Sequence, residues 1–112
     1  MRILYKIISG DHWRDAVARG VFEGSAVDHR DGFIHLSTAG QMRETAARHF
    51  PGQDGLVLVG FHEADLANLR WEPSRGGELF PHVYGPIATA LARSLDPLPL
   101  ENGAHRFPAG AA

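Results

Sequence analysis

The sequence predicts one small α+β domain with a mostly antiparallel sheet and two helices. Leu56–Phe61 is almost entirely apolar, which is typical of a central strand that is buried on both faces. The first half of the chain carries two segments with apolar residues at helical spacing, whereas strand-like segments and turns dominate the second half. At 112 residues the chain has the size of a single domain, which we expect to span residues 1–107, with a flexible tail at 108–112.

The first strand and the first helix are expected near the start of the chain. Ile3–Ile8 is rich in β-forming residues and predicts a strand. Asp11 can cap the helix that follows, and Gly20 suits its end. The apolar stripe of this helix recurs every four residues, at Trp13, Val17 and Val21.

A second strand and a second helix follow the turn signal Asp31-Gly32. Phe33–Ser37 predicts a short strand. Thr38 and Gln41 have the spacing of a capping box, so we expect a helix to begin there. Its apolar stripe is Met42, Ala46 and Phe50, and the helix is expected to end at Pro51-Gly52.

The second half is expected to be mainly strands. After the central strand, Glu63–Asn68 predicts a helical turn, and two further strands are expected at Leu69–Glu72 and Leu79–Tyr84. Pro81 confines the latter strand to an edge or to a bulge, because proline cannot donate to a ladder. The remaining elements are expected to be a turn at Ile87–Ala90 and a strand at Leu91–Leu95.

Composition and motifs exclude several classes of protein and site. Charged residues of both signs are scattered and the net charge is −2, which argues against electrostatic binding of nucleic acid. The absence of cysteine excludes disulfides and thiolate chemistry, and the histidines lack the spacing of zinc sites, so we expect no metal. No apolar window approaches the ~20 residues of a membrane helix, and no signal peptide is visible, so we expect a cytoplasmic protein.

Two strands carry the side chains from which a site can be built. Alternate residues of a strand share a face, so each strand offers an aromatic ring, a histidine and a hydroxyl on one side. The first set is Phe33, His35 and Ser37, and the second is Phe80, His82 and Tyr84. Arg70 and Glu72 also share a face, whereas Trp71 is expected in the core. These stripes predict one cleft with rings to hold a flat ligand and imidazoles to bond it or move protons.

Each of these residues also has an ordinary structural interpretation. A histidine on a strand is more often a hydrogen-bonding group of the fold than a catalyst. Thr38 is explained by its role as a helix cap. Ser37 lies just before a helix N-terminus, where backbone N–H groups favour an anion such as a phosphate.

The order of these motifs resembles the bacterial domain of unknown function 952 family. The resemblance is carried by four segments, Leu4–Ile7, Asp31–Thr38, Leu69–Glu72 and Phe80–Pro86, and it covers nearly the whole chain. It implies a fold similar to that of the ADP-ribosyltransferases, in which a split antiparallel sheet encloses a cleft for NAD. A small nucleotide-like ligand, with NAD as the cofactor or substrate, is therefore expected.

The resemblance also implies roles for the candidate residues. His35 with Ser37 would bond the nicotinamide ribose, and Tyr84 or Phe80 would stack on nicotinamide. His82 or Glu72 would orient the acceptor, while Phe33, Thr38 and Arg70 complete the expected binding surface. Tyr84 follows Glu72 in the chain, which departs from the His–Tyr–Glu order of such enzymes, so whether the domain is an enzyme stays open.

Two alternatives remain beside the transferase. His35-Leu36-Ser37 matches the H-x-[ST] signature of two-histidine phosphoesterases, with His82 as the partner but without a hydroxyl residue at the same offset after it. The other alternative is a non-catalytic module that binds a small ligand or a partner protein in the same cleft. Edge strands with unpaired backbone groups would also allow two copies of the chain to form a homodimer.

Overall fold

The computed structural model describes residues 2–109, without the side chain of Arg75, and confirms the α+β class. The helices are α1 (Gly10–Arg19), α2 (Ala26–Asp31) and α3 (Met42–His49), with 3-10 turns η1 (Glu63–Asp65), η2 (Arg75–Gly77) and η3 (Thr89–Leu91). The longer strands are β1 (Ile3–Ser9), β4 (Leu56–His62), β5 (Leu69–Pro73), β6 (Leu79–Val83) and β8 (Ala92–Leu98). The two-residue strands are β2 (Val21–Phe22), β3 (Ile34–His35), β7 (Ile87–Ala88), β9 (Leu100–Glu101) and β10 (Ala104–His105).

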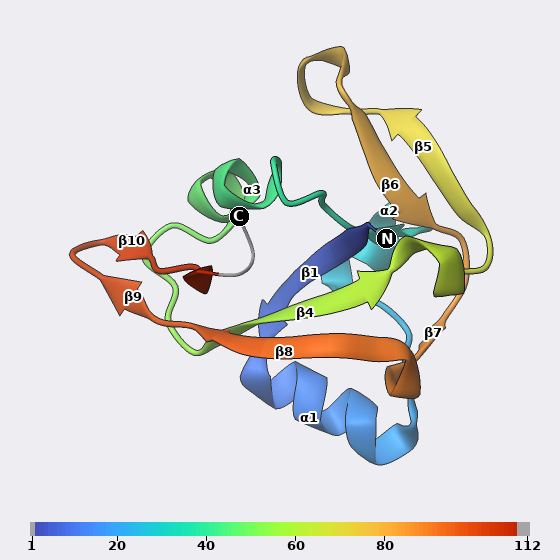
Figure 1. Ribbon diagram of the computed structural model, residues 1–112, viewed down its shortest axis with the longest axis horizontal. Coiled ribbons are helices and arrows are strands. Elements are labelled where there is room, and N and C mark those ends of the chain that lie inside the picture. The colour runs from blue at the N-terminus through green and yellow to red at the C-terminus, as the bar shows by residue number, and fades with distance from the viewer. Residues whose placement is uncertain (1, 110–112) are drawn as a thin grey trace.

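Two three-stranded antiparallel sheets form the body of the described chain. The first has the order β1-β4-β8 and the second has the order β3-β6-β5, while β2 pairs with β7 and β9 with β10. An isolated bridge joins the two larger sheets, because Tyr5 and Ser37 exchange backbone hydrogen bonds of 2.8 and 2.9 Å. In Figure 1, β1, β4 and β8 lie side by side, and the β5–β6 ribbon extends away from them.

The core consists of two clusters. One contains Trp13 and Ala16 of α1, Val59 and Phe61 of β4, and core residues of the second sheet such as Val83. The other contains Met42 and Ala46 of α3, together with Tyr5, Ile7, Leu56, Leu58 and Leu98. Because Leu58 and Val59 are neighbours in one strand and belong to different clusters, the first sheet is buried on both faces, as expected for its central strand.

Several local predictions need correction. The described chain contains a third helix, the six-residue α2, which the sequence pattern did not reveal. Ser9, rather than Asp11, caps α1, since its hydroxyl accepts the N–H of His12 at 3.1 Å. Val17 is 52% exposed, so the buried face of α1 runs through Trp13 and Ala16 instead.

The position of the strand that contains Pro81 was also predicted wrongly. β6 lies in the middle of its sheet, between β3 and β5. In an antiparallel ladder, the N–H and C=O of one residue point to the same neighbour. The carbonyl of Pro81 accepts the N–H of Leu36 at 3.0 Å, just past the last β3–β6 pair, His35 and His82. The hydrogen bond that a backbone N–H at position 81 would donate therefore lies past the last β3–β6 pair. The lack of this N–H in Pro81 removes no bond from that short ladder.

Pro108 and Ala109 follow β10, while residues 110–112 of the expected tail lie outside the described residues. Among the helices of residues 2–109, none is long and apolar enough to cross a membrane.

Candidate functional site

The main cavity lies where the two larger sheets part. It has a volume of about 540 Å³, which is within the roughly 300–1,000 Å³ typical of small-ligand sites. Its walls come from β1, β3 and β6 and from helices α2 and α3. His35 and His82 both contribute to these walls.

The strand register places His35 and His82 side by side. They are direct partners in the β3–β6 pairing, and their ring centroids are 5.4 Å apart at an angle of 69°. Phe33 stacks on His82 with centroids 4.1 Å apart and an angle of 25°, and it also contacts His35 at 4.6 Å. Ile34 and Leu36, which alternate with these residues, are buried in the core, as the period of two predicts.

His35 is held between two carboxylates. Its Nδ1 lies 2.6 Å from Asp28 Oδ1, and its backbone N–H donates to the same oxygen at 3.1 Å. Its Nε2 lies 2.9 Å from Asp31 Oδ2. Both carboxylates come from α2, which ends at Gly32 in the left-handed conformation (φ 88°) and so directs the chain into β3. Both ring nitrogens of His35 therefore face a carboxylate oxygen.

Asp28 also pairs with a buried lysine. Lys6 Nζ lies 2.8 Å from Asp28 Oδ2 and donates to the carbonyl of His35 at 3.1 Å, and the Lys6 and Asp28 side chains are only 8% and 1% exposed. Burial raises the pKa of Asp28, but the hydrogen bond from His35 and the charge of Lys6 outweigh burial and leave that pKa well below its ordinary value. Burial lowers the pKa of Lys6, and Asp28 opposes this effect.

His82 has its own carboxylate partner. Glu72 Oε1 lies 2.7 Å from His82 Nδ1 and accepts the hydroxyl of Tyr84 at 2.8 Å, while the guanidinium of Arg70 lies 4.8 Å from the Tyr84 ring centre. The hydrogen bonds from His82 and then Tyr84 lower the pKa of Glu72. The bond to Glu72 raises the pKa of the Tyr84 phenol. Glu72 thereby fixes the orientation of the His82 ring through Nδ1.

The hydroxyl residues beside the bridge between the sheets serve the start of α3. Ser37 Oγ lies 3.2 Å from Thr45 Oγ1, and both residues line the main cavity. The backbone N–H of Thr38 donates to Gln41 Oε1 at 3.1 Å. The predicted capping role of Thr38 needs correction, because the N-cap of α3 is Gln41 and the helix begins at Met42. Gln41 also donates to the carbonyl of Leu79 at 2.8 Å and so ties α3 to β6.

The predicted site residues divide into two groups. The main cavity is lined by His35, Ser37, Phe80 and His82. Glu72, Arg70 and Tyr84 instead form a layer that contacts His82 away from that lining, and Thr38 belongs to the helix start. Sequence reasoning missed the cavity residues Lys6, Arg30, Asp31 and His49 and the buried Asp28. Lys6, which interrupts an apolar strand, was the one signal in the sequence that a buried carboxylate had to be nearby.

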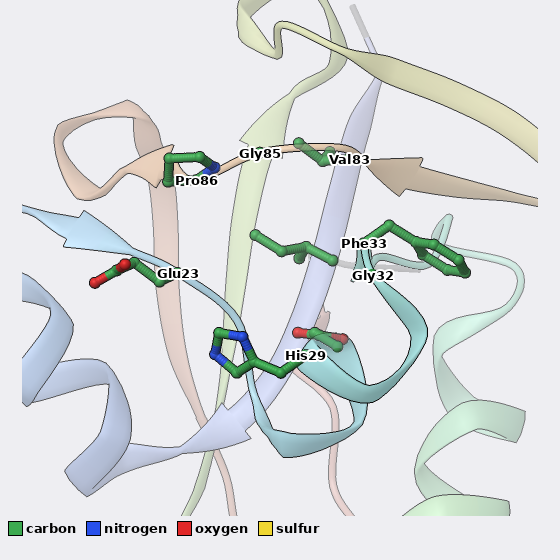
Figure 2. A pocket seen from close by; sticks show the side chains of 9 residues that line it. Glu23, His29, Gly32, Phe33, Val83, Gly85 and Pro86 are labelled. Carbon is green, nitrogen blue, oxygen red and sulfur yellow. The ribbon is translucent and has the colours of Figure 1, made fainter.

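A second, smaller cavity of about 240 Å³ shares no lining residue with the first. Figure 2 shows Phe33 and Glu23 on opposite sides of it, with His29 between them. Phe33 thus lines this cavity rather than the main one. Within residues 2–109, no group of three or more His, Asp and Glu side chains is arranged to hold a metal ion.

Comparisons with known proteins show the family. The DUF952 family model, described as a protein of unknown function, matches residues 7–94. The X-ray structure of CC0527 from Caulobacter crescentus is 46% identical, with a TM-score of 0.88 over 93% of each chain. The solution NMR structure of CC0527 is also 46% identical, with a TM-score of 0.84 over 94% of this chain and 91% of that chain. No curated protein matches the chain. The chain therefore belongs to the DUF952 family.

Proposed function

We propose that this domain binds a phosphate-bearing nucleotide in the main cavity and catalyses acid–base chemistry on it, with ADP-ribosyl transfer from NAD⁺ as the reaction. One observation carries the proposal. His35 and His82 are direct neighbours on the wall of one ligand-sized cavity, and a carboxylate orients each ring through Nδ1. A carboxylate at Nδ1 prepares the opposite nitrogen, Nε2, to act as an acid or base. In His35 that nitrogen contacts Asp31.

The cavity lining fits parts of a dinucleotide. Arg30 and His49 supply positive or protonatable groups for phosphates, and the Ser37 and Thr45 hydroxyls are suited to ribose. Phe80 offers an aromatic ring at the wall, whereas Tyr84 does not line the cavity and is covered by Arg70. The lining thus supports Phe80 over Tyr84 as the ring that meets nicotinamide.

The proposed reaction breaks the bond between ribose C1′ and the nicotinamide nitrogen, and nicotinamide leaves with the electron pair. A bond forms between C1′ and the acceptor oxygen or nitrogen, whose proton passes to an imidazole. His82 suits this role because Glu72 fixes its Nδ1 and stabilises the positive charge that the ring gains. In this scheme His82 is catalytic and Glu72 positions it.

A two-histidine phosphoesterase is the second candidate, and the histidine geometry favours it. Two imidazoles with ring centres 5.4 Å apart can flank one cyclic phosphate, so that one removes a proton from water and the other protonates the leaving oxygen. This reaction needs no NAD⁺. Binding of a nucleotide without turnover would instead support a non-catalytic module.

Calorimetric titration of NAD⁺ and chromatographic detection of nicotinamide test the proposal. We expect binding and nicotinamide release by the wild type and loss of release in His82→Ala. His29→Ala is the matched control, because His29 is exposed and does not line the main cavity. No binding at millimolar NAD⁺ contradicts the transferase, and hydrolysis of a 2′,3′-cyclic nucleotide that depends on His35 and His82 would favour the phosphoesterase.

A further inference from the structure

The two carboxylates that contact His35 differ in how firmly they are held. Asp28 has a side chain that is 1% exposed, and it accepts hydrogen bonds from Lys6 Nζ, the backbone N–H of Ser25, and both the backbone and ring of His35. Asp31 has a side chain that is 34% exposed. Its contacts are the Nε2 of His35 at 2.9 Å and the exposed Arg30 at 3.2 Å. Asp28 is therefore a fixed part of the fold, whereas Asp31 can move into water at small cost.

Asp31 also stands out from the other residues around the main cavity. It is the single acidic residue among the described residues that line this cavity. The basic and protonatable lining residues are Lys6, His12, Arg30, His35, His49 and His82. A cavity with this lining favours an anion. The one anionic group among its lining residues, the Asp31 carboxylate, contacts His35 Nε2.

We propose that Asp31 occupies the seat of a phosphate group of the ligand. In the bound state a phosphoryl oxygen would accept the hydrogen bond from His35 Nε2, and the Asp31 carboxylate would turn outward. Arg30, which contacts Asp31, would then face the same phosphate. The inference rests on the proposed function in that it takes the main cavity as the ligand site, and it identifies the chemical group that binds at His35.

The exchange replaces one charge-assisted hydrogen bond by another. The His35 ring keeps its bond to Asp28 throughout, so its orientation does not depend on which anion meets Nε2. The groups that face His35 are Asp28 and Asp31 from α2, Lys6 from β1 and His82 from β6. With Asp31 turned outward, Lys6 and Asp28 still pair with each other, and the phosphate takes the place of the Asp31 carboxylate at His35 Nε2.

The test uses inorganic pyrophosphate as the probe, with calorimetry and NMR of the histidine rings. Removing the competing carboxylate in Asp31→Asn should tighten pyrophosphate binding by roughly 3- to 10-fold, because a nearby like charge has been removed. Asp15→Asn is the matched control, since it changes the net charge equally. Asp15 is exposed on α1, pairs with Arg19 and does not line the cavity. We expect this control to bind like the wild type.

The wild type gives an independent readout. Pyrophosphate should shift the ring signals of His35 and leave in place those of His29, which is exposed on α2 and does not line the main cavity. Unchanged or weaker binding by Asp31→Asn, or an unmoved His35 ring in the wild type at saturating pyrophosphate, would overturn the proposal. Tighter pyrophosphate binding by Asp31→Asn without NAD⁺ binding by either protein would support the phosphate seat and reject the proposed nucleotide. NAD⁺ binding that is weaker in Asp31→Asn than in the wild type would reject the phosphate seat and support the proposed nucleotide.

Discussion

The two three-stranded sheets differ in the residues that their faces carry. The β1-β4-β8 sheet buries apolar residues on both faces, one against α1 and the other against α3. The β3-β6-β5 sheet buries one face through Ile34 and Val83 and places His35 and His82 on the other. The first sheet thus supplies about half of the buried apolar residues, and the second carries the two histidines of the candidate site.

The polar network around His35 connects the two sheets. Lys6 belongs to β1 of the first sheet and His35 to β3 of the second, and Asp28 of α2 bonds both. The candidate site is therefore tied to the core by one buried carboxylate. Substitutions in the two sheets should separate stability from ligand binding, and a substitution at Asp28 should affect both.

The largest effect is expected for Asp28→Asn. The change leaves the ammonium of Lys6 buried without its counter-charge, which should lower the free energy of unfolding by about 3–5 kcal/mol. Denaturant unfolding measures this change. Asp31→Asn is the control, because it removes the exposed carboxylate from the same histidine and should change stability far less than Asp28→Asn does. Equal losses in both variants would contradict the distinction between the anchored and the exchangeable carboxylate.

The pH dependence of stability gives the same substitution a second readout. The pKa of Asp28 is depressed in the folded protein, so its contribution is fully present above the unfolded-state value of about 3.9 and is lost as the pH falls below it. The difference in unfolding free energy between wild type and Asp28→Asn should therefore be constant from about pH 7 to 5 and shrink below about pH 4. A difference that grows on acidification would contradict the depressed pKa.

The surroundings of the two histidines show which parts of the candidate site could be predicted from the sequence. Alternation along Phe33–Ser37 and Leu79–Tyr84 was enough to place His35 and His82 on one face and Ile34 in the core, because strand geometry is local. Glu72, which contacts His82, was among the predicted site residues. The carboxylate that contacts His35 was not predictable, since Asp28 lies on the short helix α2, whose pattern is too brief to recognise. The central place of β6 was missed because the ladder length of β3, which makes Pro81 tolerable, is a property of the tertiary structure.

The next effect should be confined to the first sheet. Leu58 is fully buried in β4, so Leu58→Ala should cost about 2–5 kcal/mol of unfolding free energy through lost burial and a cavity. Ligand binding should persist below the melting temperature, because Leu58 does not line the main cavity. Leu95→Ala on β8 is the matched control, since that side chain is 54% exposed. Loss of nucleotide or pyrophosphate binding in folded Leu58→Ala would show that the two sheets are not separable.

A smaller effect is expected at Gly60 of β4, where an added Cβ would meet side chains of both neighbouring strands. A Cβ at Gly60 would collide with Ser94 Oγ and lie 2.8 Å from Ile3 Cγ2, so Gly60→Ala should cost about 1–3 kcal/mol through overpacking. Adding Ser94→Gly removes one of the colliding atoms and should restore part of the loss, which a double-mutant cycle from denaturant unfolding measures. Strict additivity would show that the collision with Ser94 is not the cause.

The smallest effect on stability is expected in the second sheet, where it comes with a distinct spectroscopic signature. Glu72 raises the pKa of Tyr84 through its hydrogen bond and charge, whereas Arg70 opposes this rise. In a Tyr5→Phe background, Tyr84 is the single tyrosine of the chain, and its ionisation can be followed by ultraviolet absorbance. Glu72→Gln should lower the Tyr84 pKa towards the ordinary value of about 10, and Arg70→Gln should raise it further. Shifts of the same sign in both variants would mean that the layer behind His82 does not act through these charges, and Glu72 would then lose its proposed role in positioning His82.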